Sequence, residues 1–280
     1  MTVERHSSWN MEKKREIRSV ARLCLAVGLL SASTARAGVV TVVRPPVADA
    51  TIFEENGDSS DAKSPGLFAG RTTTDRIRRA FLRFDLTGIP AGVTVSSVQV
   101  VLSLTRANSG SVFASLYRVS AAWGEGTSDA SIPGGSGAPA TAGDPTWTMR
   151  VYPGTAWTNP GGDTLTSPSA TTLIGSSLVN YFWTTTPALL ADVQGWIAAP
   201  ATNFGWQLRI DESQIAPTAK RFGSREQSEA ASRPVLVVTY DDPAVGGAPV
   251  TVVPALDTPA LLALAAVLAA GGAWLLRRAS

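Results

Sequence analysis

Apolar and polar residues alternate in many short stretches through the middle of this chain, between residues 46 and 241. The clearest is residues 78–86, which places on one face Ala80, Leu82, Phe84 and Leu86. Alternation with a period of two predicts half-buried β-strands. Many short strands without regularly interspersed helices indicate an all-β, antiparallel sandwich.

Eight further stretches carry weaker strand signals. They are residues 50–54, 67–71, 94–104, 112–119, 178–183, 204–210, 219–223 and 234–240. Residues 187–198 instead have apolar residues at helical spacing, and Thr186 and Pro187 suit the N-cap and first helical position. We therefore expect one short helix that closes one end of the sandwich. Trp196 and Trp206 follow the helix and strand periodicity, which predicts that both are core residues.

The first 37 residues contain the three regions of a secretory signal peptide in the right order. Basic residues up to Arg22 precede the apolar run 23–30, and the small-x-small triplet 35–37 follows. This pattern predicts recognition by signal peptidase, export, and a mature start near Gly38. The alternative is a cytoplasmic N-terminal helix.

The other end of the chain carries a second apolar segment, residues 259–276, followed by Arg277 and Arg278. It is just long enough to span a bilayer, and a dibasic end is typical of the cytoplasmic side. The alternative is a buried core helix. Together with residues 253–256, the segment resembles C-terminal sorting signals of the IPTL-CTERM and PEP-CTERM type. The resemblance implies a transient membrane anchor that a sorting protease cuts during export to the cell surface.

Histidine and cysteine occur once each, as His6 and Cys24, and both lie in the expected leader. A mature chain without them excludes Ser-His-Asp and Cys-His catalysis, His- or Cys-ligated zinc, haem, iron–sulfur clusters and disulfides. Carboxylate acid/base chemistry, oxygen-ligated Ca²⁺ and plain binding remain possible.

The net charge of +2 belongs to the two ends of the chain. Residues 38–256 hold fifteen Lys and Arg against eighteen Asp and Glu. A mildly acidic body without a basic cluster argues against nucleic acid as a partner, since that binding needs several phosphate contacts.

Several short motifs in the body resemble the DNRLRE domain of secreted bacterial and archaeal proteins, which is related to disaggregatase-type and carbohydrate-binding modules. The motifs are ADATI at 48–52, RAFLRFDL at 79–86, IPAG at 89–92, LYRV at 116–119, WGEGT at 123–127, DVQGW at 192–196, NFGW at 203–206, SRE at 224–226 and RPVLVVTY at 233–240. The resemblance implies a jelly-roll-like β-sandwich in an exported protein. It implies no particular substrate and no catalytic residues.

A long stretch rich in Gly, Pro, Ser and Thr, residues 124–169, has no sustained periodicity. Long loops in compact domains are usually functional or mobile. Its aromatic residues could stack on sugar rings while its polar residues bond hydroxyl groups. The candidates for ligand binding are Trp147, Tyr152, Trp157, Asp144, Asn159 and Asp163. The alternative is that these rings simply pin the loop to the sandwich.

An oxygen-rich cluster follows the first expected strand, and its candidate Ca²⁺ ligands are Asp49, Glu54 and Asp58. The alternative is a solvated acidic turn. Ser224, Arg225 and Glu226 precede the last strand, and we interpret the Arg and Glu as a structural pair.

The sequence thus predicts a signal peptide (1–37), a linker (38–45), a β-sandwich domain (46–241), a second linker (242–253) and a sorting segment (254–280). We expect an exported, cell-surface or extracellular, non-catalytic module that binds polysaccharide or contributes to an extracellular matrix. One alternative is a carboxylate-dependent glycoside hydrolase or lyase, which would need two facing acids in one groove. The other is a purely structural surface domain.

Overall fold

The structure is a computed structural model that describes residues 37–55, 57–108, 110–132, 134–213 and 216–245. Its strands are β1 (Gly38–Arg44), β2 (Pro46–Phe53), β3 (Ser59–Asp61), β4 (Gly66–Arg71), β5 (Ile77–Phe84), β6 (Thr94–Ala107), β7 (Val112–Arg118), β8 (Ala138–Pro139), β9 (Met149–Val151), β10 (Thr155–Ala156), β11 (Ala170–Ile174), β12 (Asn180–Trp183), β13 (Trp206–Ile210), β14 (Lys220–Gly223) and β15 (Val235–Asp242). The helices are α2 (Pro187–Ala198) and the 3₁₀ turns η1 (Pro200–Thr202) and η2 (Ala230–Ser232).

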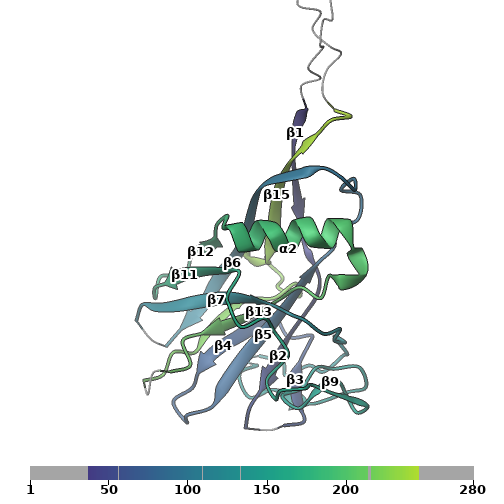
Figure 1. Cartoon of the computed structure of the whole chain (residues 1–280). Helices are drawn as coiled ribbons and strands as arrows, with labels where there is room; N and C mark the ends of the chain where they lie inside the picture. The colour runs from purple at the N-terminus through teal and green to yellow at the C-terminus, as the bar shows by residue number, and fades with distance from the viewer. Residues whose placement is uncertain (1–36, 56, 109, 133, 214–215, 246–280) are drawn as a thin grey trace, which may run out of the picture. The chain divides into compact units, whose positions relative to one another are not determined.

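All strand pairs are antiparallel, and hydrogen bonds connect most strands in the order β1-β15-β6-β14-β4-β5-β13-β7-β11. In addition, β12 pairs with β6, and β2 pairs with β5 and β3. The inner faces of β6 and β15 pack against those of β5, β13 and β7 around one large hydrophobic core. The expected all-β sandwich is therefore confirmed at the level of antiparallel β-structure with one helix (Figure 1).

Helix α2 has the predicted bounds, and strong local signals define its N-terminal end. The Thr186 hydroxyl accepts a hydrogen bond from the backbone N–H of Leu189, and Pro187 occupies the first turn. Trp196 and Trp206 are core residues, as expected, and their rings meet edge to face with centroids 4.5 Å apart. Buried Asp192 joins the helix to the sheet by accepting hydrogen bonds from the Trp206 indole at 2.8 Å and the Ser169 hydroxyl at 2.5 Å.

The expected linker at residues 38–45 is wrong, because Gly38–Arg44 form strand β1, which pairs with β15 along its whole length. The compact unit spans Ala37–Gly246 and so begins earlier than residue 46. The run Val-Val-Thr-Val-Val at 39–43 is rich in β-branched residues, which favour strands.

The leader and the C-terminal segment, residues 1–36 and 246–280, lie outside the described residues. Within the described ranges, no helix is both long and apolar enough to cross a membrane.

Candidate functional site

The long loop between β7 and β11 covers one half of the outer face of the β2-β5-β13-β7-β11 layer. Underneath it lies a second, smaller hydrophobic core, made by Ala48, Ala50, Ile52, Ala62, Phe81, Val119, Trp123 and Trp157. Phe81 is fully buried here, although alternation places it on the face of β5 opposite the main core. The other half of this face, over β13, β7 and β11, is where Phe113 and Leu173 stand exposed.

Trp157 is one of the ligand-binding candidates that the structure places in the interior. Only 5% of the residue is exposed, its ring stacks on Phe81, and its indole N–H donates to the Thr146 carbonyl at 2.9 Å. Because the ring is buried by stacking and its N–H is already hydrogen-bonded, Trp157 cannot act as an exposed platform for a sugar. The alternative weighed from the sequence, in which the ring pins the loop to the sandwich, describes this residue.

The other two aromatic candidates are half-buried. Trp147 packs against the smaller core and carries the Arg79 guanidinium over its ring, 4.8 Å from the centroid. Tyr152 lies in the turn between β9 and β10. In the described part of the chain, neither ring lines the pockets of about 320, 180 and 430 Å³.

The polar candidates of the loop make hydrogen bonds within the loop. Asp144 is fully buried and accepts from the backbone N–H and hydroxyl of Thr141 and the N–H of Ser128, so it cannot bond a ligand hydroxyl in this structure. Asp163 accepts from the backbone N–H groups of Thr158 and Asn159, each at 2.9 Å. Asn159 is exposed. These carboxylates order the loop.

A pocket of about 320 Å³ opens on the uncovered half of the outer face. Its lining comes from β7, β13 and the segment after β13, and consists of Phe113, Ser115, Tyr117, Arg209, Ile210, Asp211, Glu212 and Ser213. Alternation explains the chemistry of the walls, since Phe113, Ser115 and Tyr117 are the outward positions of β7 and Arg209 is an outward position of β13.

Arg209 is the cationic residue among those that line this pocket. Its guanidinium lies over the Tyr117 ring, 4.7 Å from the centroid, and donates to the Gln207 side chain at 2.5 Å and the Thr164 hydroxyl at 2.8 Å. Burial, together with the nearby charge of Arg79, lowers the pKa of Arg209 to about 10. The side chain stays cationic near neutral pH, and its fixed N–H groups lie over the Tyr117 ring.

Glu212 borders the same pocket and is fixed by Arg79 through two hydrogen bonds of 2.7 and 2.8 Å. Bidentate pairs of this kind have a defined geometry. Because Arg79 also contacts Trp147 and the Gly161 carbonyl, it ties the covering loop to the edge of the open half.

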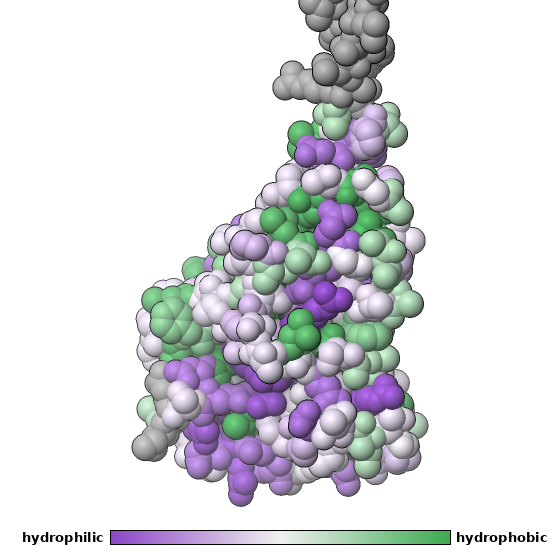
Figure 2. All heavy atoms as spheres, viewed as in Figure 1, coloured by the Kyte–Doolittle hydropathy of each residue, from purple (hydrophilic) through white to green (hydrophobic). Residues whose placement is uncertain are grey.

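Apolar side chains flank the open half at the edge of the sheet. Phe113 on β7 lies directly opposite Leu173 on β11, and they are 59% and 53% exposed. Figure 2 shows apolar residues gathered on the side of the molecule where β11 and β12 lie. An exposed aromatic beside polar side chains is a common arrangement in ligand sites.

The expected Ca²⁺ ligands Asp49, Glu54 and Asp58 do not come together. Asp49 lies in the middle of extended strand β2 and Glu54 follows its last residue, a separation of about 16 Å at ~3.3 Å per residue. Glu54 accepts from the Ile77 backbone N–H, and Asp58 is exposed. Because the backbone from Asp49 to Glu54 is extended, these carboxylates cannot converge on one ion.

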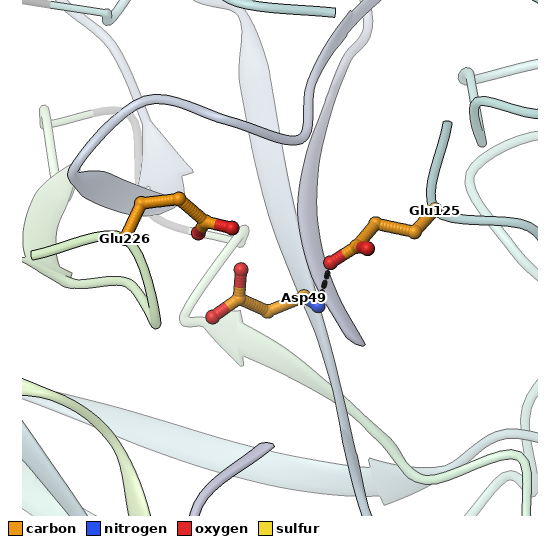
Figure 3. A group of neighbouring side chains, drawn as sticks. All are labelled: Asp49, Glu125 and Glu226. Carbon is orange, nitrogen blue, oxygen red and sulfur yellow. Dashed lines mark hydrogen bonds between the residues drawn. The ribbon is translucent and has the colours of Figure 1, made fainter. Parts of the chain in front are cut away.

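Asp49 instead meets Glu125 and Glu226, with one oxygen from each residue lying within 4.8 Å of the others. Figure 3 shows the three side chains converging from β2, the covering loop and the segment after β14. The three residues belong to the motifs at 48–52, 123–127 and 224–226 that carry the family resemblance. Sequence reasoning singled out each motif and missed that they meet.

Two cations fill the space between these carboxylates. Arg225 donates twice to Glu125 at 2.7 Å and pairs with Glu226 at 3.0 Å, which confirms the expected structural pair. Lys63 pairs with Glu125 at 3.2 Å. Burial, and then the charge of Glu226, raises the pKa of Asp49 well above its usual range. The group is thus a network of ion pairs that joins three segments.

One comparison with known families gives a match. The family model for carbohydrate-binding module family 96 matches residues 40–159, which include β2, β5, β7 and most of the covering loop. A comparison with curated proteins finds no match. The family match supports a carbohydrate-binding-module-like domain in this part of the chain.

Proposed function

We propose that this protein is a non-catalytic module that binds polysaccharide through the open half of the outer face, over β7, β13 and β11. The observation that carries the proposal is the pocket in which Tyr117 and Arg209 form a paired aromatic and donor surface, with exposed Phe113 at its edge. The family match over residues 40–159 supports the ligand class.

The chemistry of the pocket suits a sugar. A pyranose presents C–H groups that pack on aromatic faces and hydroxyl groups that accept from a guanidinium and donate to a carboxylate. Phe113 and Tyr117 supply rings, Arg209 supplies donors, and Glu212 supplies acceptor oxygens. The volume of about 320 Å³ lies at the small end of ligand pockets, roughly 300–1,000 Å³, which fits one or two sugar units on an open surface.

We further propose that the module works outside the cell. The leader-like residues 1–37 support export and cleavage by signal peptidase. The apolar segment 259–276 supports a transient membrane anchor that a sorting protease cuts. Mass spectrometry of the chain exported by its native host tests this part. We expect a species that begins near Gly38, and an intact species beginning at Met1 would contradict it.

Affinity electrophoresis tests the binding proposal. The full chain and the variants Tyr117→Ala and Phe113→Ala are run in gels that contain each member of a panel of neutral and acidic polysaccharides. At least one polysaccharide is expected to retard the wild type, and both variants should lose at least tenfold in affinity, about 1.4 kcal/mol.

The matched control is Phe182→Ala, because Phe182 is an exposed phenylalanine on β12 that does not line the pocket. It should be retarded like the wild type. If no polysaccharide retards the wild type, the structural-domain alternative replaces the proposal. If Phe182→Ala loses affinity as strongly as Phe113→Ala, the binding surface is misplaced.

A further inference from the structure

A second pocket, separate from the open face, lies on the side of β4, β14 and β6 that points away from the main core. Its volume is about 180 Å³. Four of the ten residues that line it are basic, and none of the ten is acidic. The basic residues are Arg78, Arg106, Lys220 and Arg221.

Strand register brings two of these residues together. Arg221 on β14 is the partner of Arg106 on β6, and its partner on the other side is Phe68 on β4. Directly opposite residues of an antiparallel pair have Cβ atoms roughly 4.5–5.5 Å apart. Burial, and then the charge of Arg106, lowers the pKa of Arg221, which agrees with this proximity. Both arginine side chains therefore start from neighbouring points on one face of the sheet.

Both guanidinium groups have donors that the described residues do not use. Arg106 is exposed, and its side chain makes no hydrogen bond or ion pair in the described part of the chain. Arg221 is half-buried, and its Nε–H donates to the Thr105 hydroxyl at 2.9 Å. The two terminal nitrogens of Arg221 have no partner among the described residues, and neither of them is a buried atom. A ligand can therefore reach donors on both arginines.

The charged groups of the other two basic residues already have partners. Arg78 donates to both carboxylate oxygens of Glu55 and to the Gly135 carbonyl. The Lys220 ammonium donates to the Gly110 carbonyl at 2.9 Å. These two residues add positive charge around the pocket, and the available donors belong to Arg106 and Arg221.

The arginine pair needs an anion from outside the described chain. Like charges directly opposite each other destabilise a strand pair. No ion pair of the described residues includes Arg106 or Arg221. A bound anion would offset this repulsion. Two such arginines are too few for a nucleic-acid surface, which needs several phosphate contacts.

The size of the pocket and the number of donors narrow the anion further. The volume of about 180 Å³ is below the roughly 300–1,000 Å³ of sites that hold a whole small molecule, so the pocket fits a charged group. One guanidinium can engage both oxygens of a carboxylate. A sulfate or phosphate group has further oxygens, so two guanidinium groups can bind it at once.

We propose that this pocket binds one tetrahedral oxyanion group, sulfate or phosphate, between the guanidinium groups of Arg106 and Arg221. The group is either a free ion or an ester on a sugar, and the two sources share this chemistry. The proposal does not depend on the polysaccharide face, since the two pockets share no lining residue.

Nuclear magnetic resonance of the ¹⁵N-labelled full chain tests this site. Sodium sulfate and sodium phosphate are titrated separately while sodium chloride holds the ionic strength constant. The signals followed are the Nε–H of Arg221, assigned by its loss in Arg221→Gln, and the backbone amides of Ser136 and Ala219, which line the pocket. We expect at least one of the two ions to shift these signals with saturation at millimolar concentration. A titration with chloride alone should give no saturable shift.

Variants of the two arginines make the result specific. Arg106→Gln and Arg221→Gln should each weaken binding at least tenfold, read from the amides of Ser136 and Ala219. Arg233→Gln is the matched control, because Arg233 is exposed, does not line the pocket and makes no ion pair with a described residue. It should bind the ion like the wild type. The backbone amide spectrum of each variant shows whether it is folded.

Further titrations separate the two sources of the group. Glucose 6-sulfate and glucose 6-phosphate present it as an ester, and glucose is the uncharged control. Saturable shifts with an ester and none with glucose would support a sugar substituent as the ligand. Saturable shifts with the free ions alone would support the free ion. Either outcome agrees with an oxyanion site at Arg106 and Arg221.

Two results would overturn the proposal. One is that no ion or ester gives a saturable shift beyond that of chloride, which would mean that the arginines are only solvated. The other is binding that survives in both arginine variants, which would place the anion elsewhere. Neither result bears on whether polysaccharide binds the open face.

Discussion

The indole ring of Trp157 stacks on the phenyl ring of Phe81 with centroids 5.3 Å apart and planes 5° from parallel. The contact joins the covering loop to β5, and Trp123 packs on the same phenyl ring with centroids 5.1 Å apart. These loop aromatics close a second core, and Phe113 on β7 stays exposed on the other half of the same face, where we propose that polysaccharide binds.

Trp157→Ala should therefore cost about 3–5 kcal/mol of unfolding free energy, the usual loss for a buried tryptophan. Phe113→Ala, at an exposed position, should stay within roughly 0.5 kcal/mol of wild type. Urea unfolding followed by circular dichroism measures both. Equal stability of the two variants would show that the smaller core contributes nothing to the fold.

Asp192→Ala should be strongly destabilising, because Asp192 is a buried carboxylate that pairs with Arg118 and accepts from Ser169 and Trp206. Removing one partner of a buried ion pair typically costs about 3–5 kcal/mol. Asp192→Asn keeps an acceptor for the Trp206 indole and should lose less. Thermal unfolding of the two variants checks the order, and a reversed order would contradict the role assigned to this oxygen.

Asp61 gives the protein a pH dependence of defined sign. Burial raises the pKa of Asp61 to about 6, above its ordinary value of 3.8, so the folded chain binds more protons than the unfolded chain between these pH values. Stability from this group is present below pH 4 and is lost as pH rises to about 6, at most about 3 kcal/mol. Asp61→Asn keeps an acceptor for the Ser64 and Ala130 amides and should flatten this part of the curve. The measurement is the free energy of unfolding of both proteins between pH 4 and 6. If its slope against pH is the same in Asp61→Asn as in the wild type, Asp61 does not carry this pH dependence.

Calcium should not stabilise the fold through the Asp49 group. Arg225 and Lys63 already pair with the carboxylates there, and burial raises the pKa of Asp49 well above its usual range. The melting temperature of the full chain should be the same in excess Ca²⁺ and in excess chelator. A filled site at 100 times its dissociation constant would add about 2.7 kcal/mol, so a clear rise in melting temperature with Ca²⁺ would contradict this reading.

Elements with strong local signals, such as a capping residue or a regular apolar pattern, could be predicted from the sequence. Residues 187–198 combine a cap, a first-turn proline and a helical apolar pattern, and the strand pattern of β5 places Ala80 and Leu82 in the main core. Strand β1 was missed because its run of valines adjoins the expected cleavage site.

The carboxylate group and the pocket on the open face were harder to predict, because each is formed by residues that are far apart in the sequence. Asp49 meets Glu125 and Glu226 although 76 and 177 positions separate them along the chain. Alternation identifies Phe81 and Tyr117 as outward residues in the same way, and only the path of the covering loop decides that Phe81 is buried and Tyr117 lines a pocket.

A map of the polysaccharide footprint tests the central claim most directly. A soluble oligosaccharide is prepared from the polysaccharide that retards the wild type in affinity electrophoresis. Amide signals of the ¹⁵N-labelled full chain are then followed while this oligosaccharide is titrated. We predict that the signals that shift belong to residues 113–117, 171–173 and 207–213, which surround the open half of the outer face. Shifts confined to the covering loop at residues 144–163, with residues 113–117 unchanged, would contradict the account and return the binding site to Trp147 and its neighbours.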